Sequence, residues 1–149
     1  MAIYAKITGT KQGAINGSVT ARAFDGQIPI ESCEFGIGGP YDVATGQASG
    51  RRVARPIHLI KTLDKSSPLL FTSATTNEAL TVDISYTIEG EGHKKYVTLK
   101  LTNAMIRDFN HLASSDGTAV EKLSLTYTKF EFTWVEGGIV AVDDWATPT

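Results

Sequence analysis

The chain has 149 residues, of which 42% are apolar and 20% are charged, and its formal net charge is −2. This length suits one domain with a substantial core, and the composition is that of an ordinary soluble globular protein. The slightly acidic balance provides no basic footprint for nucleic acid or for a membrane surface. The single cysteine, Cys33, excludes an intrachain disulfide, and we interpret it as a small buried apolar residue.

The N-terminus lacks the basic segment and apolar run of a secretory signal peptide. No apolar stretch approaches the roughly 20 residues that a helix needs to span a bilayer. We therefore expect no membrane insertion, and a protein that is cytoplasmic as made and leaves the cell, if it does, without a cleavable signal peptide.

The first part of the chain predicts two strands. Apolar side chains alternate over residues 3–7, and a loop with glycine and asparagine follows over residues 13–17. A second strand begins at residue 28, but its apolar phase shifts by one position before it ends. Because side chains alternate strictly along a strand, this shift requires a bulge near Glu31 or Ser32.

A polar, glycine-rich segment over residues 38–52 is the longest internal stretch without apolar periodicity. Loops of this length are usually functional or disordered, so we expect a flexible loop. The run from Gly36 to Gly39 lacks the lysine and the following helix of a nucleotide-binding loop, and we interpret it as a turn.

A strand-to-helix corner follows this loop. Residues 55–60 predict a strand interrupted by Pro56. Ser67 is expected as the N-cap of a short helix, with Pro68 at its first position and a stop at Asn77. The expected apolar face of this helix consists of Leu69, Leu70, Phe71 and Ala74.

The clearest strand covers residues 80–88, where apolar and polar residues alternate throughout. Residues 89–93 predict a hairpin loop, and residues 97–101 predict the returning strand. A break is expected near Asn103, with further apolar positions beyond it.

The C-terminal part contains a turn over residues 114–117 and two strands, over residues 123–127 and 130–134. The apolar phases of these strands differ, which implies a bend near Thr128. A glycine-containing tail is expected over residues 136–149.

Seven or so strands with regular turns and one helix indicate a mainly β fold. We expect a compact β-barrel of two sheets with one short α-helix, from about Ser67 to Asn77, in a single domain over residues 1–149. The phase shifts suit strands that bend from one sheet into the other.

The sequence contains no set of residues spaced for catalysis. His58, His93 and His111 are scattered without partners at metal-ligand spacing, so no metal and no cofactor are expected. Asp143 and Asp144 are adjacent in the tail, but paired-carboxylate chemistry is the weaker interpretation there. We therefore expect no enzyme.

The run from Lys61 to Leu70, Lys-x-x-Asp-Lys-x-Ser-Pro-x-Leu, resembles a known family. It is similar to the haemolysin-coregulated protein (Hcp) family, the tube subunits of bacterial type VI secretion systems. Residues 28–36, 97–104 and 121–134 match as well, so that the resemblance covers most of the chain in order.

The resemblance implies a small β-barrel whose subunits close into a hexameric ring. Rings of the family stack into a tube that a contractile sheath propels from the cell, with small effectors in its lumen. It therefore implies a homo-hexamer in stacked rings as the assembly, with sheath, spike and small effector proteins as partners. At the residue level it implies a structural corner that fixes the helix against the barrel, made of Asp64, Lys65, Ser67 and Pro68.

Two further surfaces follow from combining alternation with this architecture. Ser32 and Glu34 point away from the core and are expected to face the ring lumen and its cargo; solvent or a neighbouring subunit is the alternative. The loop over residues 38–52 matches the family's long variable loop toward the next ring. Its candidate stacking residues are Tyr41, Asp42, Arg51 and Arg52, although a solvated arginine pair is the competing interpretation.

Two other functions remain open at the level of sequence. One is a tail-tube protein of a phage-like contractile injection device, for which the barrel physics is nearly the same. The other is a monomeric ligand-binding β-sandwich that stacks a ligand on Trp134 or Trp145.

Overall fold

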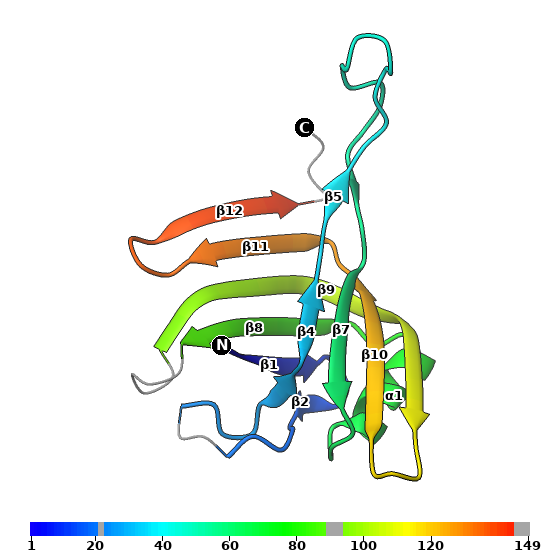
Figure 1. Cartoon of the computed structure of the whole chain (residues 1–149), viewed down its shortest axis with the longest axis vertical. Helices are drawn as coiled ribbons and strands as arrows, with labels where there is room; N and C mark the ends of the chain where they lie inside the picture. The colour runs from blue at the N-terminus through cyan, green and yellow to red at the C-terminus, as the bar shows by residue number, and fades with distance from the viewer. Residues whose placement is uncertain (21–22, 89–93, 145–149) are drawn as a thin grey trace.

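The computed structural model describes residues 1–20, 23–88 and 94–144 (Figure 1). Its one helix is α1 (Ser67–Thr76). The strands of the first half are β1 (Ala2–Gly9), β2 (Gly13–Ile15), β3 (Ile28–Ile30), β4 (Ser32–Glu34), β5 (Ile37–Gly38), β6 (Val53–Ala54) and β7 (Ile57–Thr62). The strands of the second half are β8 (Leu80–Ile88), β9 (Lys94–Ala113), β10 (Ala119–Thr126), β11 (Lys129–Trp134) and β12 (Ile139–Asp144).

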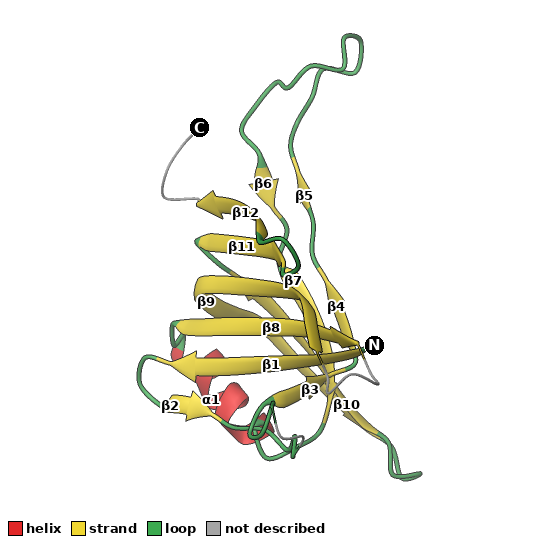
Figure 2. Cartoon of the chain, turned by 90° about the vertical axis from the view of Figure 1, so that its left-hand side faces the viewer, coloured by secondary structure: helices red, strands yellow, loops and turns green. Residues whose placement is uncertain are grey.

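Two antiparallel sheets enclose the core (Figures 1 and 2). The first sheet contains β1 with β2, β3 and β8, followed by β9, β11 and β12. The second contains β9, β10, β7 and β4. The fold is therefore mainly β with two sheets and one short helix, as predicted, but its hydrogen-bonded ladder is not a closed barrel.

The long strand β9 joins the two sheets. Its first half pairs with β8 and β11, and its second half pairs with β10. Asn103, at the change of partners, has a positive φ of 55°. The register of the β8–β9 ladder also shifts at this point, as it does at a β-bulge. A bulge bends a strand without ending it, which explains the predicted break.

A second join lies at Glu31, between β3 and β4. The strand β3 pairs with β1 in the first sheet, whereas β4 pairs with β7 in the second. The amide of Glu31 donates to the carbonyl of Ile60 at 2.7 Å. The irregularity predicted near Glu31 or Ser32 is thus confirmed as the point where the chain changes sheets.

The core contains the apolar residues that the alternation predicts to point inward. Among the fully buried members are Ile57, Leu59, Val82, Ile84, Leu99, Leu101, Leu123 and Leu125. The predicted strand over residues 80–88 is confirmed as β8 with the same bounds. Its predicted hairpin loop, residues 89–93, lies outside the described residues, as does Trp145.

The helix begins one residue earlier than predicted. Ser66 is the N-cap and Ser67 the first helical residue, and Ser66 makes no side-chain cap hydrogen bond. Instead, Asp64 Oδ1 accepts hydrogen bonds from the amide and hydroxyl of Ser66, which turns the chain before Ser67. Asn77, in the left-handed conformation, ends the helix as predicted.

The predicted apolar face of α1 is only partly correct. Leu70 is fully buried and Ala74 packs against the core, whereas Leu69 and Phe71 are exposed. Since residues one position apart point about 100° apart on a helix, the run Leu69–Leu70–Phe71 cannot all face the core.

Three segment predictions need correction. Residues 13–17 do not form only a loop, because Gly13–Ile15 is β2 and pairs with β1. The strand predicted over residues 55–60 begins at Ile57, since Arg55 and Pro56 lie between β6 and β7. Part of the predicted tail is β12, which folds onto β11 through Gly137 and Gly138, both at positive φ. No helix in the described ranges has the length and apolarity to cross a membrane.

Candidate functional site

A cluster of charged and polar side chains, buried except for His111, lies where β7 leads into α1. Lys61, fully buried on β7, places its Nζ 2.6 Å from Oε1 of Glu121 on β10 and 2.9 Å from Oγ of Ser67. Ser67 in turn donates to the same carboxylate oxygen, at 2.6 Å. The other oxygen of Glu121 lies 2.8 Å from Nδ1 of His111. We call Lys61, Ser67, His111 and Glu121 the corner cluster.

Strand periodicity explains why these charges are buried. Lys61 is in phase with inward-facing Leu59, and Glu121 is in phase with inward-facing Leu123. The two charges are directly opposite in the β7–β10 ladder. This pair was not predicted, because Lys61 and Glu121 lie just outside the strands predicted over residues 55–60 and 123–127. Extending the alternation of each strand would have placed both charges at inward positions.

Hydrogen bonds keep the buried carboxylates charged. Burial raises the pKa of the Glu121 carboxyl, but the hydrogen bonds from Lys61, Ser67 and His111 outweigh it and hold the pKa below its usual value. For Asp64, burial likewise raises the pKa, but the hydrogen bonds from Ser66 and the positive charge of Lys61 outweigh burial and lower the pKa below its usual value. Both carboxyls are therefore ionised at neutral pH.

The four predicted corner residues divide into two pairs. Asp64 lies 3.3 Å from Lys61 Nζ, and its amide donates to Ser67 Oγ at 3.1 Å. Asp64 and Ser67 are thus joined to the buried charges. Lys65 and Pro68 are exposed on the outer side of the same turn.

A second buried carboxylate, Glu78, ties α1 to the β1–β2 turn. It is 1% exposed, and its Oε2 accepts from the backbone amides of Lys11 and Gln12, both at 2.7 Å. Its Oε1 accepts from Gln12 Nε2 at 2.7 Å and from Ser73 Oγ at 3.0 Å. Burial opposes ionisation, but these donors lower the pKa of Glu78 to about 2. Glu78 was not predicted as a site residue, because three of its four hydrogen bonds come from Lys11 and Gln12, which are distant in the chain.

Residues 36–55 form an arm that projects from the body of the molecule (Figures 1 and 2). The segment predicted as a flexible loop contains pairing, between β5 and β6 and between Tyr41 and Ala48. At the tip, Asp42 accepts from the amide of Ala44 at 2.8 Å, and Val43 is 88% exposed. The arm is thus a narrow β-ribbon with an exposed tip.

An ion pair fixes the base of this arm to the body. Arg52 donates through Nε and Nη2 to the two carboxylate oxygens of Asp143 on β12, at 2.5–3.1 Å. This contact lowers the pKa of Asp143 and raises that of Arg52. Arg52 thus has a partner in the same chain, and a contact of Arg52 across a ring interface stays a prediction.

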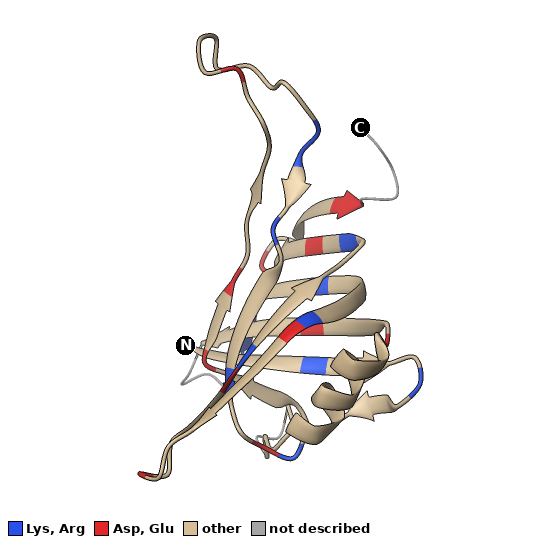
Figure 3. Cartoon of the chain, turned by 90° about the vertical axis from the view of Figure 1, so that its right-hand side faces the viewer, with Lys and Arg blue, Asp and Glu red and all other residues tan. Residues whose placement is uncertain are grey.

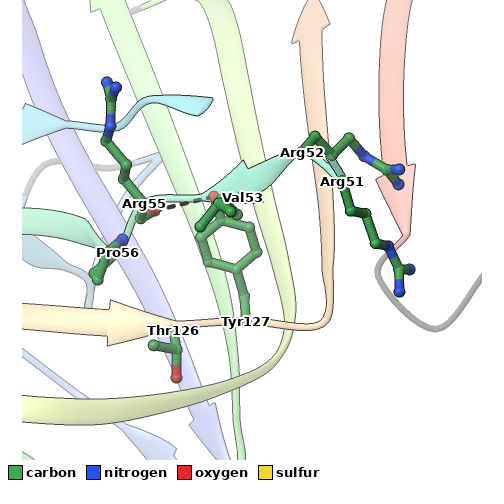
Figure 4. Close-up of a pocket in the computed structure, with 8 residues that line it drawn as sticks. Arg51, Arg52, Val53, Arg55, Pro56, Thr126 and Tyr127 are labelled. Atoms are coloured by element: carbon green, nitrogen blue, oxygen red, sulfur yellow. Dashed lines mark hydrogen bonds between the residues drawn. The ribbon is translucent and has the colours of Figure 1, made fainter. Parts of the chain in front are cut away.

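The other arginines of the arm base diverge from one another. A cavity of about 380 Å³ lies there, lined by Arg51, Arg52, Val53, Ala54, Arg55, Pro56, Thr126 and Tyr127. Figure 4 shows Arg55 on one side of the Tyr127 ring and Arg51 and Arg52 on the other. The Tyr127 hydroxyl contacts the carbonyl of Arg55 at 3.4 Å. The arginines therefore do not form a single anion pocket.

Ser32 and Glu34 are both exposed on β4, as the alternation predicts. Cys33 and Phe35 pack against the core, and burial raises the pKa of the Cys33 thiol. Ile37, which continues the alternation of Cys33 and Phe35, is 56% exposed, because the chain has by then left the body for the arm.

The hairpin of β11 and β12 carries uncovered apolar side chains. On β12, Ile139, Val140 and Val142 are each more than half exposed, and β12 pairs only with β11 among the described strands. On β11, Trp134 is 46% exposed and meets Tyr96 edge to face at 5.9 Å between centroids. This hairpin offers an apolar surface and, on β12, a strand edge that no other described strand pairs with.

The described residues contain no cluster of three or more histidine, cysteine or acidic residues that could hold a metal. His58 contacts Ser124 Oγ at 2.8 Å, and His111 contacts Glu121, so both serve structural contacts between strands. His93 lies outside the described ranges. Asp143, one of the adjacent tail carboxylates, is bound to Arg52.

Comparison with known proteins identifies the family of this chain. Residues 4–134 match the family described as "Type VI secretion system effector, Hcp". The chain belongs to the Hcp family. It is 32% identical to the "Major exported protein" of Pseudomonas aeruginosa, over 97% of this chain and 95% of that protein.

Solved Hcp structures share the fold. An Hcp protein crystal structure is 28% identical, with a TM-score of 0.88 and coverage of 97% of this chain and 99% of that one. Hcp1 from E. coli EAEC 042 is 26% identical with a TM-score of 0.86, covering 97% and 99%. Hcp3 of Pseudomonas aeruginosa is 27% identical with a TM-score of 0.76, covering 96% and 99%. The chain is thus a type VI secretion Hcp protein with the fold of its family.

Proposed function

We propose that the chain is the structural subunit of a type VI secretion tube, in which six copies form a ring and rings stack. The uncovered β11–β12 hairpin carries this proposal most directly. A strand that exposes Ile139, Val140 and Val142 beside a free edge is normally covered by another chain. Membership of the Hcp family supports the type VI system over a phage-like injection device.

A ring requires a head-to-tail interface whose rotation closes. The hairpin supplies one half of such an interface, since β12 is the outermost strand of the first sheet, at the end nearest the arm (Figure 1), and exposes Ile139, Val140 and Val142. The role is mechanical, and we propose no enzymatic activity.

The arm is the proposed stacking element. Tyr41 and Asp42 lie near its exposed tip, and Arg51 and Arg52 lie at its base. Because the tip is small, each arm contributes a weak contact, and a ring gains strength from several such contacts at once. Rings held in this way assemble inside a sheath and separate after export.

Ser32 and Glu34 are the proposed lumen residues. Both are exposed on β4, which pairs only with β7 among the described strands. Glu34→Arg reverses a charge that cargo would meet, so it should change effector retention while rings persist. Unchanged retention of every effector tested would place Glu34 outside the lumen.

The corner residues have a proposed structural role. Asp64 and Ser67 connect β7 to α1 through the buried charges, and Pro68 and Lys65 shape the outer turn. The corner thereby holds α1 on the body and leaves the faces and the arm for assembly.

Export tests the proposal in the cell. The partners would be the sheath, the spike and small effector proteins, and the protein would leave the cytoplasm without a cleavable signal peptide. The protein should appear at full length in culture supernatant only when the sheath is intact. Equal amounts in the supernatant of a sheath-deficient strain would contradict this function.

A further inference from the structure

A row of titratable and hydroxyl side chains crosses the outer face of the second sheet. Glu34 on β4 lies directly opposite His58 on β7, and His58 lies directly opposite Ser124 on β10 (Figure 1). Asp108 on β9 continues the row opposite Ser124. Because these strands bury the alternate residues, the four side chains share the face that is turned away from the core. The row therefore places a histidine beside Glu34, which is a proposed cargo residue.

The imidazole of His58 is held from the side of β10. Its Nδ1 contacts Oγ of Ser124 at 2.8 Å, which leaves Nε2 on the side of the ring away from Ser124. Glu34 is exposed, and the ion pairs of the described residues do not include it. Directly opposite side chains of an antiparallel ladder have Cβ atoms about 5 Å apart. The carboxylate of Glu34 thus lies within reach of the imidazole without being bound to it in this structure.

The other charged groups around this row balance one another. Those on the same face and at its margins are all exposed, namely Glu31, Arg55, Arg107, Asp108 and Lys122. The guanidinium of Arg55 lies beside Gly36 and Gly38, at the base of the arm. Together with Glu34 these are three acidic and three basic residues, and Figure 3 shows the two signs interspersed. The face is therefore neutral while His58 is neutral, and protonation of His58 makes it positive.

We propose that His58 and Glu34 form a proton-dependent pair that controls the binding of basic effector segments. When the imidazole is neutral, the free carboxylate of Glu34 binds a lysine or arginine side chain of the effector. When His58 takes up a proton, the imidazolium pairs with Glu34 across the β4–β7 ladder and displaces that cation.

The chemistry of the two side chains suits this exchange. A histidine ordinarily changes its charge between about pH 5 and pH 8, a range in which glutamate side chains in model peptides are ionised. Opposite charges that face each other across two strands attract, so the imidazolium competes with an external cation for the same carboxylate. The assignment rests on the proposed function, in which Glu34 faces the lumen, and it names the ligand class and the regulation of that site.

Peptide binding at two pH values tests the pair. The wild type should bind a fluorescein-labelled hexalysine peptide about threefold or more weakly at about pH 5.5 than at about pH 7.5, as measured by fluorescence anisotropy. His58→Gln stays neutral and should bind the peptide equally at both values. His111→Gln is the matched control and should keep the pH dependence of the wild type. Equal binding by the wild type at both values, or a pH dependence that survives in His58→Gln, would overturn the assignment.

A glutamate variant tests the ligand class. Glu34→Gln should bind the hexalysine peptide weakly at both pH values, because the carboxylate that binds the cation is gone. Glu136→Gln removes an exposed glutamate between β11 and β12 and should bind as the wild type does. Binding by Glu34→Gln at the strength of the wild type would overturn the assignment.

Hydrogen exchange of the β4 amides gives a readout that a general charge effect on peptide binding does not move. At about pH 5.5 these amides should exchange about twofold or more slowly in the wild type than in His58→Gln, because the pair then holds β4 on β7. At about pH 7.5 the two proteins should exchange alike. Equal rates at the lower pH would overturn the pair.

The failures of the two proposals are distinguishable. Six-subunit rings that bind the peptide equally at both pH values would reject the proton-dependent pair and retain the tube subunit. Binding that depends on pH through His58 and Glu34, in a protein without any six-subunit species, would reject the ring and retain the pair.

Discussion

At the scale of single residues, Lys61 and Glu121 are the least expected feature of the fold, because both charges are withdrawn from solvent. Their exposures are 0% and 2%, and 2.6 Å separates Nζ from Oε1. A buried pair of this kind is weak as a source of net stability, but breaking it leaves an uncompensated charge.

Lys61→Met should therefore destabilise the fold by about 3–5 kcal/mol, because Glu121 remains buried without its cation. Lys65→Met removes an exposed lysine four residues away and should change the unfolding free energy by about 0.5 kcal/mol or less. Urea unfolding of both variants measures the difference. Equal effects would show that the corner cluster does not behave as a buried ion pair.

Among single residues, Glu78 should make the clearest contribution to the pH dependence of folding stability. Its folded-state pKa of about 2 lies below the ordinary value of 4.5, so the unfolded chain binds the proton more readily. Its stabilisation is complete above pH 4.5 and is lost as the pH falls toward 2. Glu78→Gln should cost about 2 kcal/mol at neutral pH, because four donors lose a charged acceptor.

Thermal unfolding measured from pH 7 to pH 2 tests this assignment. The wild type and Glu78→Gln should converge as the pH falls, since both then carry an uncharged side chain. Curves that stay parallel down to pH 2 would contradict it.

At the scale of elements, the arm depends on one ion pair at its base. Arg52 and Asp143 are about one-quarter to one-third exposed, so their pair should contribute little to the free energy of unfolding. Its effect is on the position of the arm relative to β12.

Asp143→Asn should leave the unfolding free energy within about 1 kcal/mol of the wild type, while amides of β5 and β6 exchange with solvent several-fold faster. The exchanged pair, Arg52→Asp with Asp143→Arg, should restore slow exchange. Unchanged exchange in Asp143→Asn would show that the ribbon alone holds the arm.

Periodicity predicted the elements that have a buried face and missed β12, which has none. Strict alternation located β8 with its bounds, and the phase shift near Glu31 located the change of sheets. By contrast, β12 is almost wholly exposed, so its residues Ile139–Asp144 have no buried face to alternate.

The candidate site was predicted only in part. The sequence placed Asp64 and Ser67 at the corner and Ser32 and Glu34 on an exposed face. The contacts of Lys61 with Glu121, of Glu78 with Lys11 and of Asp143 with Arg52 were missed, because each joins residues that are 60 or more positions apart. Strand pairing, rather than local pattern, brings those partners together.

At the scale of the whole molecule, the proposed ring places a second copy of the chain on the exposed β11–β12 hairpin. Val142→Asp places a charge on β12, where the side chain is 54% exposed, so the subunit should still fold. The ring should dissociate, because an unpaired charge in an apolar interface is costly. Leu112→Asp, at the other end of the body and 67% exposed, is the control and should retain the ring. Light scattering of both variants decides whether β12 lies in the interface.

The mass of the native protein in solution tests the central claim most directly. Light scattering across a concentration series should give a closed species six times the 16.0 kDa mass of one chain, with larger stacked species at high concentration. A single species of 16.0 kDa at every concentration would contradict the assignment of this chain as a ring-forming tube subunit.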